Sequence, residues 1–386
     1  MPCSGRAPVM ARKVELSLRR WVYMIYTFKV GTPMTGFIDS DGVDECRMSG
    51  PVRYLEEATY RPYWLRDGVL ESTLESVLSK REQIEALAEA LSDASRFYMV
   101  GSGGSYSVQH PIRYVAEKNT DVPVFSSSGW GFLEMSPTAV DEDAACIFIS
   151  HSGTTKEVLR GLEWAKEKGA ATLSLTERTD SPLARSARHA LGYEGKAMTV
   201  GKLTALYLLF GGILREKGQP VGDRMIEVAE SLPELLPPMV PQAKASAKPV
   251  GLNLKDADEM FVMGGGINWG LAYQFAVCSL QEMCWVHATP IDFSEWRHGP
   301  LEVFTPGRAA AFLRGRGDQG ENEENVIEWC RGNGVECLVY DSQGRDVDSL
   351  ATPFTLFVEL EWLGYYLSLA KNRDMERWRH YDRVTF

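Results

Sequence analysis

Short apolar runs and longer stretches with helical periodicity alternate along most of the chain, which predicts strands that alternate with helices. The pattern begins with a helical lead-in at residues 69–94, where leucines recur at helical spacing. Strands are then predicted at residues 96–101, 122–125, 144–150 and 171–176, and helices up to about residue 117, at 156–167 and at 199–216. This alternation predicts right-handed βαβ units and a parallel sheet over residues 96–217.

The same alternation starts again in the second half, after a proline-rich stretch at residues 233–250 that predicts a helix end and a linker. Strands are predicted at residues 259–263, 285–288, 309–313 and 335–339, and helices at 268–282, 322–330 and 354–370. Both halves open with a strand, a glycine turn and a helix, so we expect a duplicated domain. The expected fold class is therefore α/β, with two parallel sheets flanked by helices.

The pattern also predicts the boundaries between segments of the chain. The segments are an N-terminal extension at 1–47, a helical lead-in at 48–95, a first domain at 96–217, a helix and linker at 218–253, a second domain at 254–371 and a tail at 372–386. We expect the extension to be disordered or an over-extended start, with Met34 and Met48 as alternative first residues.

Composition and charge narrow the classes of partner. The net charge of -11 argues against nucleic acid or an anionic membrane as the main partner. We expect no membrane-spanning segment, because no apolar run approaches the roughly 18 residues that span a bilayer. Seven cysteines are scattered without a Cys-x-x-Cys pair, which favours reduced thiols in a cytoplasmic protein over a zinc site or disulfides. No metal site or organic cofactor is indicated.

Two hydroxyl-rich turns follow predicted strands of the first half, and each precedes a helix. The turn at 101–105 is not a dinucleotide fingerprint, because Tyr106 occupies the third glycine position, and no Walker-type Gly-Lys-Ser/Thr follows. The turn at 150–155 brings four hydroxyls to the next helix start. Two such turns on one sheet edge favour a single phosphate monoester, held by hydroxyls, amides and helix dipoles without a large basic cluster. The alternative is that both turns only cap helices.

A carboxylate and an imidazole in the second half are candidates for chemistry. Glu282 stands at the predicted end of helix 268–282, and His298 immediately precedes the break formed by Gly299 and Pro300. A Glu and a His that meet across a cleft are suited to general acid–base catalysis near neutral pH. The alternative is a surface glutamate and a loop histidine without a shared role.

These motifs together resemble the sugar isomerase (SIS) domain family. Residues 149–157 are similar to its Ser-x-Ser-Gly-x-Thr phosphate loop, and residues 103–106 resemble its first phosphosugar loop. Glu282 and His298, sixteen positions apart, resemble the catalytic pair in the isomerase half of glucosamine–fructose-6-phosphate synthase. The resemblance covers residues 90–386 and implies two flavodoxin-like SIS domains per subunit. It also implies a homodimer or higher homo-oligomer, in which the His-Gly-Pro segment completes the neighbouring subunit's site.

The resemblance implies a role for each matching position, with a small-molecule phosphosugar as the ligand. The 6-phosphate would be held by Ser105, Ser150, His151, Ser152 and Thr155, beside the backbone of Gly103 and Gly104. Glu282 would move a proton between C1 and C2 of the open-chain sugar, and His298 would assist ring opening. Residues 194–202 match a sugar-contacting loop only loosely.

Two departures from the synthases matter for function. The chain has no glutaminase domain with its N-terminal cysteine nucleophile. Arg383, the third catalytic candidate, stands where the synthases have a lysine that forms a Schiff base with fructose 6-phosphate. Arginine stays protonated and does not form that imine. A substrate that already carries an amine at C1 does not need the lysine, which points to the related deglycases of fructosamine (Amadori) 6-phosphates.

Three functions therefore stay open on the sequence alone. The first is a fructosamine 6-phosphate deglycase, in which Arg383, Asp382 or His380 contacts the amino-acid part of the substrate. The second is an aminosugar-phosphate deaminase or an aldose/ketose phosphate isomerase. The third is a SIS protein that binds a phosphosugar without catalysis. Four further histidines are expected to be structural or exposed: His110, His189, His287 and His380.

Overall fold

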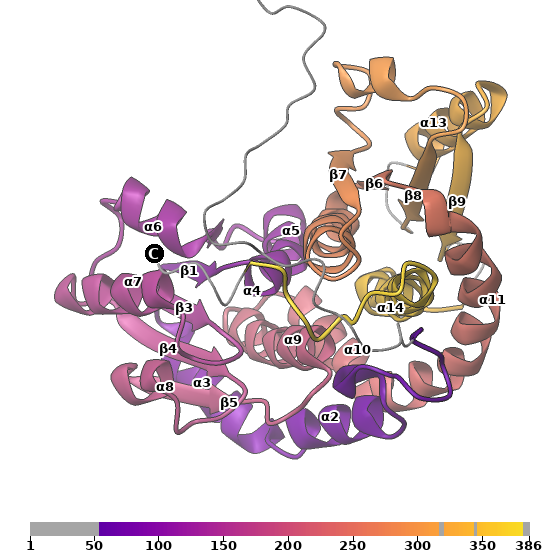
Figure 1. Ribbon diagram of the computed structural model, residues 1–386. Helices are drawn as coiled ribbons and strands as arrows, with labels where there is room; N and C mark the ends of the chain where they lie inside the picture. The colour runs from indigo at the N-terminus through magenta and orange to yellow at the C-terminus, as the bar shows by residue number, and fades with distance from the viewer. Residues whose placement is uncertain (1–53, 316–319, 343–345, 381–386) are drawn as a thin grey trace, which may run out of the picture. The chain divides into compact units, whose positions relative to one another are not determined.

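A computed structural model describes residues 54–315, 320–342 and 346–380 (Figure 1). These residues belong to one compact unit that begins at Tyr54. The expectations for the extension at 1–47, for its alternative starts and for Arg383 and Asp382 lie outside the described residues.

The first sheet has five parallel strands in the order β2-β1-β3-β4-β5. Its strands are β1 Arg96–Gly101, β2 Val124–Ser127, β3 Ala144–Ile149, β4 Ala171–Thr176 and β5 His189–Gly192. The helices between them are α4 Gly104–Ser107, α5 Gln109–Asn119, α6 Gly129–Met135, α7 Lys156–Glu167 and α8 Pro182–Ser186. The short elements β5, α6 and α8 were not predicted, because a few residues carry too little periodicity to be recognised.

Both faces of this sheet are buried. Alternate residues of β3 point to opposite faces, so that Phe148 packs with α6 and α7 while Ile147 faces the larger core. That larger core contains α9, Met198–Glu216, which Figure 1 shows on the side of the sheet opposite α7. The continuous apolar runs of the sequence follow from this burial on two faces. Among the described residues, α9 alone is long and apolar enough to cross a membrane, yet 83% of its apolar window is buried inside the fold.

The helical lead-in consists of two helices where one was predicted. They are α2 Val69–Leu78 and α3 Arg81–Ser92, separated at Ser79 and Lys80. Leu74 of α2 and Ile84 of α3 are both buried in the core that α9 shares. The break lets each helix turn its apolar face onto α9, which a single straight helix would not do.

The predicted linker at 233–250 is instead mostly helical. The structure has α10 Val221–Leu235 and α11 Val240–Asn253, although Pro249 lies inside α11. Packing along α14, Thr352–Ala370, outweighs the cost of that proline, because tertiary contact supplies most helical stability. The helices α11 and α14 approach each other closely, since a Cβ at Gly251 of α11 would lie 2.7 Å from Cβ of Tyr366 of α14.

The second sheet has four parallel strands in the order β7-β6-β8-β9. Its strands are β6 Glu259–Gly264, β7 His287–Asp292, β8 Ala309–Arg314 and β9 Glu336–Asp341, and its remaining helices are α12 Trp269–Tyr273, the π-helical η5 Gln274–Gln281 and α13 Gly320–Gly332. The short 3-10 helices within the described residues are η1 Tyr63–Leu65, η2 Pro237–Met239, η3 Leu254–Asp256, η4 Gly266–Asn268, η6 Pro300–Val303 and η7 Ser349–Ala351.

The strand predicted at 285–288 begins and ends later than expected. Trp285 has a φ of 58°, in the left-handed region, so the chain turns there and β7 starts only at His287. The strand then continues through Pro290. A proline is tolerated here because β7 is an edge strand, whose outer side needs no N–H donor. In both sheets the first strand lies inside the sheet, which is the flavodoxin-like order. The predicted fold class is confirmed.

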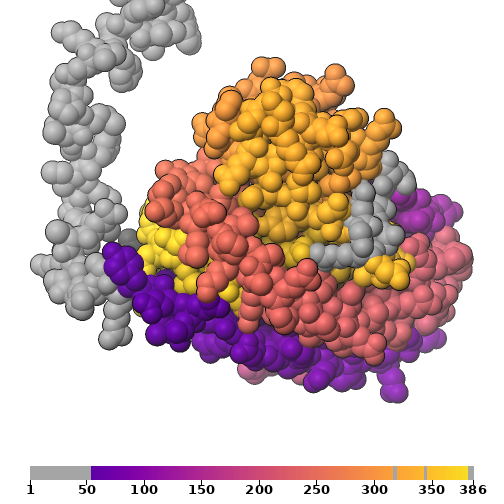
Figure 2. Space-filling view, turned by 90° about the vertical axis from the view of Figure 1, so that its right-hand side faces the viewer, coloured from indigo at the N-terminus to yellow at the C-terminus, as the bar shows by residue number. Residues whose placement is uncertain are grey.

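The two ends of the described chain lie together. The Tyr365 hydroxyl donates to the carbonyl of Tyr60 at 2.6 Å, and the Met375 amide donates to the Tyr60 hydroxyl at 2.6 Å. Figure 2 shows this contact on the surface, where the indigo start of the described chain lies against the yellow C-terminal segment. The tail after α14 is therefore tied to the body of the protein up to Met375.

Candidate functional site

The loops after β1 and β3 lie at the point of the first sheet where the strand order reverses. In the order β2-β1-β3-β4-β5, the connections from these two strands lead in opposite directions, which opens a crevice at their carboxyl ends. The Ser102 hydroxyl of the first loop donates to Oε1 of Glu157 behind the second, at 2.7 Å. The two hydroxyl-rich turns therefore meet at one sheet edge.

The second loop is tightly closed. The hydroxyls of Ser150 and Thr155 lie 2.8 Å apart, and the Gly153 amide donates to Ser150 Oγ at 3.1 Å. Gly153 has a φ of 65°, and any Cβ there would collide with Ser181, so the turn requires glycine. Ser152 is exposed, and its hydroxyl pairs with that of Thr154 at 2.8 Å.

His151 of this loop already has partners on both ring nitrogens. Its Nδ1 contacts the Tyr193 hydroxyl, and its Nε2 lies 3.5 Å from Oε2 of Glu177. Burial, together with the charge of Lys202, lowers the pKa of His151 to about 4, although Glu177 opposes the shift. The imidazole is therefore neutral at pH 7 and brings no positive charge to a phosphate.

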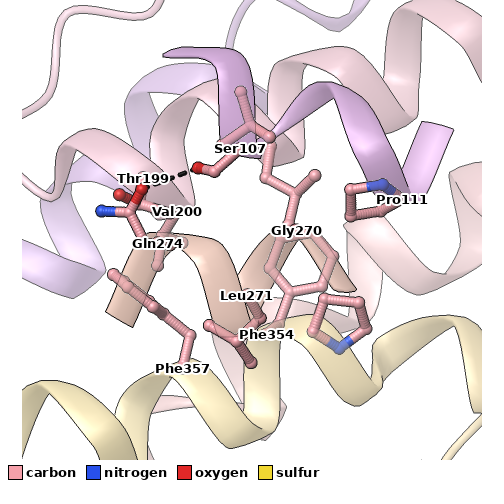
Figure 3. A pocket seen from close by; sticks show the side chains of 12 residues that line it. Ser107, Pro111, Thr199, Val200, Gly270, Leu271, Gln274, Phe354 and Phe357 are labelled. Atoms are coloured by element: carbon pink, nitrogen blue, oxygen red, sulfur yellow. Dashed lines mark hydrogen bonds between the residues drawn. The ribbon is translucent and has the colours of Figure 1, made fainter. Parts of the chain in front are cut away.

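The second half of the chain packs directly on the first loop (Figure 3). The Ser107 hydroxyl of α4 donates to Oε1 of Gln274 at 2.7 Å. A Cβ at Gly104 would lie 3.0 Å from the same oxygen, and a Cβ at Gly270 would collide with the Ser107 carbonyl. The apolar cavity beside this junction has a volume of about 20 Å³, which is room for about one water molecule and not for a substrate.

This junction places the helix that leads to Glu282 against the first loop. Cys278 of η5 lies beside Gly103, since a Cβ at that glycine would be 3.9 Å from its Sγ. Burial and the charge of Glu282 raise the pKa of the Cys278 thiol to about 12, whereas Lys202 opposes the shift. Glu282 and Lys202 therefore both lie near Cys278, on the side of the first loop.

The helix that ends at Glu282 is wider than an α-helix. The Glu282 amide donates to the carbonyl of Val277 at 3.1 Å, five residues back, as a π-helix requires. The carbonyl of Ser279 then accepts from the amides of both Met283 and Cys284. Such π segments are often found at functional sites, where they redirect a side chain.

The Glu282 carboxylate forms part of the wall of an open pocket. The pocket has a volume of about 560 Å³ and is lined by Glu282, Trp285, His287, Trp378, Arg379 and His380, among others. The Glu282 residue is exposed to solvent as a whole, but the protein around its carboxylate removes part of the water there. This burial raises the pKa of Glu282, and the indole N–H of Trp378, which donates to Oε1 at 2.8 Å, partly opposes the rise.

The tail brings Trp378 to this pocket. The Arg373 and Arg379 guanidinium carbons lie 4.1 and 4.0 Å from the ring centroid of Trp285. Both contacts are in the range of cation–π interactions, and they hold the tail next to the residue at which the chain turns into β7. His380 lines the same pocket, whereas Arg383 lies outside the described residues.

The structure does not bring His298 to Glu282 within one chain. Glu282 precedes β7 and His298 follows it, and a strand of six residues extends about 20 Å. The His298 side chain is exposed, and its amide donates to the Glu295 carbonyl at the far end of the strand. An acid–base pair of these two residues would need the His298 of a second chain.

Two residues of this site were not identified from the sequence. Lys202 was placed only in a loosely matching loop, yet it is buried in α9, and its Nζ donates to Ser105 Oγ at 3.2 Å. The signal was present, because Lys202 is the only charge among the apolar residues 199–214. Trp378 had no such signal, since no pattern in a short tail predicts what it covers.

No metal centre is evident in the described part of the chain. No group of three or more His, Cys, Asp or Glu side chains there is placed to hold a metal ion. The five cysteines within the described ranges are free thiols.

Comparison with known proteins places this site in a family context. Residues 90–208, which include both loops and Lys202, match the family model of the SIS domain. Residues 90–208 form a SIS domain. The fructoselysine 6-phosphate deglycase of Escherichia coli (strain K12) is 28% identical to this chain over 292 residues, which cover 75% of this chain and 86% of that protein.

Solved structures share the fold over most of the chain. A Bacillus subtilis protein assigned as a phosphosugar isomerase superposes with a TM-score of 0.74 at 24% identity, covering 81% of this chain and 99% of that one. The C-terminal domain of the glucosamine-fructose-6-phosphate aminotransferase from Francisella tularensis gives a TM-score of 0.71 at 17% identity. The superposition covers 83% of this chain and 99% of that domain. At these identities the likeness describes the fold alone, which these structures share with this chain beyond residues 90–208.

Replacing Trp378 by phenylalanine should raise the pKa of Glu282 further. The ring would be kept, but the N–H that stabilises the ionised carboxylate would be lost, so burial would act unopposed. The Glu282 carboxyl would then take up its proton at a higher pH than in the wild type. NMR titration of ¹³C-labelled glutamate carboxyls, with Glu282→Gln to assign the signal, measures the shift. An unchanged pKa in Trp378→Phe would show that the hydrogen bond does not act on this group.

Proposed function

We propose that this protein is an enzyme that cleaves fructosamine (Amadori) 6-phosphates to glucose 6-phosphate and a free amine or amino acid. The observation that carries the proposal is Glu282, a carboxylate with a raised pKa on a pocket wall, at the end of the helix that packs on the first hydroxyl-rich loop. Similarity to a fructoselysine 6-phosphate deglycase over 75% of the chain supports the proposal.

The phosphate would bind at the crevice between the loops after β1 and β3. The hydroxyls of Ser105, Ser150 and Thr155 and the amides of the two helix starts offer the donors that a phosphate monoester needs. Ser152 and His151 contribute from the same loop, His151 as a neutral group. The sugar would extend from this crevice past Cys278 toward Glu282.

Glu282 would act as the base. In the open-chain substrate, C2 is a carbonyl and C1 carries the amine, so the C1 proton is acidic. Glu282 removes this proton, and the carbonyl oxygen gains one, which gives an enaminol. Return of a proton to C2 moves the double bond to C1 and nitrogen as an imine, and water hydrolyses the imine to glucose 6-phosphate and the amine. A raised pKa suits a base that must hold and return the proton near neutral pH.

The pocket beside Glu282 would receive the amine part of the substrate. It is lined by Arg379, His287 and His380, and the sugar phosphate would approach the carboxylate from the side of Cys278. A guanidinium and two imidazoles favour a leaving group that carries a carboxylate, as an amino acid does. Arg383 stands where the synthases have the lysine that forms an imine with the sugar. An arginine there agrees with a fructosamine substrate, because a substrate that already carries its amine needs no imine with the protein.

The catalytic site would be completed by a second copy of the chain. Within one chain, β7 separates Glu282 from His298, and the His298 side chain is exposed to contact from outside. A symmetric homodimer in which each His298 reaches the partner's sugar would form two equivalent sites. In that arrangement His298 assists ring opening before Glu282 acts.

The direct test is a coupled assay with glucose-6-phosphate dehydrogenase. Fructoselysine 6-phosphate, fructose-asparagine 6-phosphate and glucosamine 6-phosphate are offered in parallel to the purified protein. We expect glucose 6-phosphate from at least one Amadori substrate, and a loss of about a hundredfold or more in kcat for Glu282→Gln, which lacks the base. Glu328→Gln, an exposed carboxylate on α13, is the control and should keep full activity.

The other outcomes of the assay point to the alternative functions. Free ammonia from glucosamine 6-phosphate, without product from the Amadori substrates, would identify a deaminase. If phosphosugars raised the melting temperature but no substrate were turned over, the protein would be a phosphosugar-binding protein.

Mixing two inactive variants tests the shared site. Glu282→Gln and His298→Ala would each lack one group in every site of their own homodimers. A mixed dimer would contain one site with both mutations and one with neither, so unfolding and refolding them together at equal amounts should restore about a quarter of wild-type activity. The Glu282→Gln, His298→Ala double variant mixed with wild type is the matched control. If mixing restored no activity while dimers exchanged subunits, the two groups would belong to one chain's site.

A further inference from the structure

A lysine side chain lies buried against the first hydroxyl-rich loop. Lys202 is 4% exposed and belongs to α9, whose other buried residues are mostly apolar. Its Nζ donates to Ser105 Oγ at 3.2 Å, and Ser105 is itself 6% exposed. The ammonium group therefore points from the core of the protein at the position where the resemblance places a phosphate.

No carboxylate of the described residues balances the charge of Lys202. Within residues 54–315, 320–342 and 346–380, no Asp or Glu oxygen lies within 4 Å of its Nζ. The groups near it are Ser105, the thiol of Cys278 and the neutral imidazole of His151. Burial lowers the pKa of Lys202 to about 8, so the side chain is still mostly protonated at pH 7. A buried charge without a partner destabilises the fold unless an anion arrives to pair with it.

We propose that Lys202 is the cation that neutralises the phosphate of the substrate between the loops after β1 and β3. This inference rests on the proposed function only in that the ligand is a phosphate monoester. The sequence had suggested a site of hydroxyls, amides and dipoles without a basic group. The structure adds one full positive charge, delivered from behind the loop by α9.

The hydrogen bond to Ser105 gives Lys202 a second effect. An ammonium group only donates, so Ser105 Oγ must accept from it and can direct its own proton elsewhere. The phosphate oxygens lie on the open side of the loop, where that proton would point. Lys202 thus fixes the Ser105 hydroxyl as a donor to the phosphate and supplies the charge that strengthens the bond.

The position also explains how an anion binds to this protein. The chain has a net charge of -11, which opposes the approach of a doubly charged phosphate ester. A single exposed lysine would be screened by water and salt, whereas a buried one acts through low-dielectric surroundings. The unpaired charge is a cost in the free protein, and a bound phosphate removes that cost, which strengthens binding.

Neutral variants of Lys202 test this inference without any turnover. Lys202→Gln keeps a donor for Ser105 but removes the charge, and Lys202→Met removes both. Isothermal titration with glucose 6-phosphate should give a Kd about tenfold or more weaker for both variants, because a hydrogen bond to a charged group is lost. Lys166→Met, at an exposed ion pair on α7, is the matched control and should bind as the wild type does.

Stability without ligand separates this role from a structural one. In phosphate-free buffer, Lys202→Met should melt at the wild-type temperature or above it, since an unpaired buried charge has been removed. Addition of inorganic phosphate should raise the melting temperature of the wild type and leave that of Lys202→Met nearly unchanged. A variant that melts lower without phosphate, or fails to fold, would show that the amine serves the fold and would overturn the inference.

Three further outcomes would also overturn it. Equal Kd values for wild type and Lys202→Gln would show that the charge does not contact the phosphate, although the phosphosugar site itself would stand. A borohydride-trapped adduct of fructose 6-phosphate on Lys202 would show that the amine reacts with the sugar carbonyl. If the wild type bound no phosphate ester, both this inference and the proposed site would fail. Failure of catalysis alone, with binding intact, would leave the role of Lys202 standing.

Discussion

The close contact between α12–η5 and α4 is the constraint on which the site depends. Gly270 leaves no space for a side chain next to the Ser107 carbonyl, and Gln274 bonds the Ser107 hydroxyl from the same helix. This contact fixes the helix of the second half on the first loop of the first half. Glu282 at its end therefore has a defined position relative to a loop almost 180 residues earlier in the chain. A carboxylate and a phosphate site from different halves can act on one substrate only when they are held in this way.

Burial acts in opposite directions on the two charged groups of the site. It favours the protonated form of Glu282 and the neutral form of Lys202, so each pKa moves toward the working pH. For Glu282 the result suits a group that takes up and returns a proton. For Lys202 the result is an electrostatic cost that an anion would remove. The same physical effect thus prepares one group for chemistry and the other for binding.

Much of the fold followed from the sequence, because its strands are buried on both faces. Apolar runs predicted β1 and β4, and helical periodicity predicted α7, with the bounds that the structure has. Their alternation predicted the α/β class that the structure confirms. The failures have local causes. Prolines suggested a linker where packing on α14 maintains α11, and the left-handed turn at Trp285 delayed the start of β7. Neither tertiary packing nor a positive φ at a tryptophan is visible in a periodic pattern.

Part of the site could also be predicted from the sequence. Turns that follow parallel strands lie at one edge of a sheet, so the turns that contain Ser105, Ser150 and Thr155 could be grouped before the strand order was known. The separation of Glu282 and His298 was not predicted. A strand was expected between them at 285–288, but that it starts at His287 and runs through Pro290 to Asp292 is visible only in the structure. The contact of Trp378 with Glu282 depends on how the tail folds back, which only the structure describes.

The most direct test is a crystal structure with sorbitol 6-phosphate, an open-chain analogue that lacks the carbonyl and cannot react. The account predicts its phosphate among the hydroxyls of Ser105, Ser150 and Thr155 and beside Lys202, with C1 and C2 within contact of the Glu282 carboxylate. A phosphate bound instead beside Arg379 in the pocket, or a sugar that points away from Glu282, would contradict the claim that the two halves form one site.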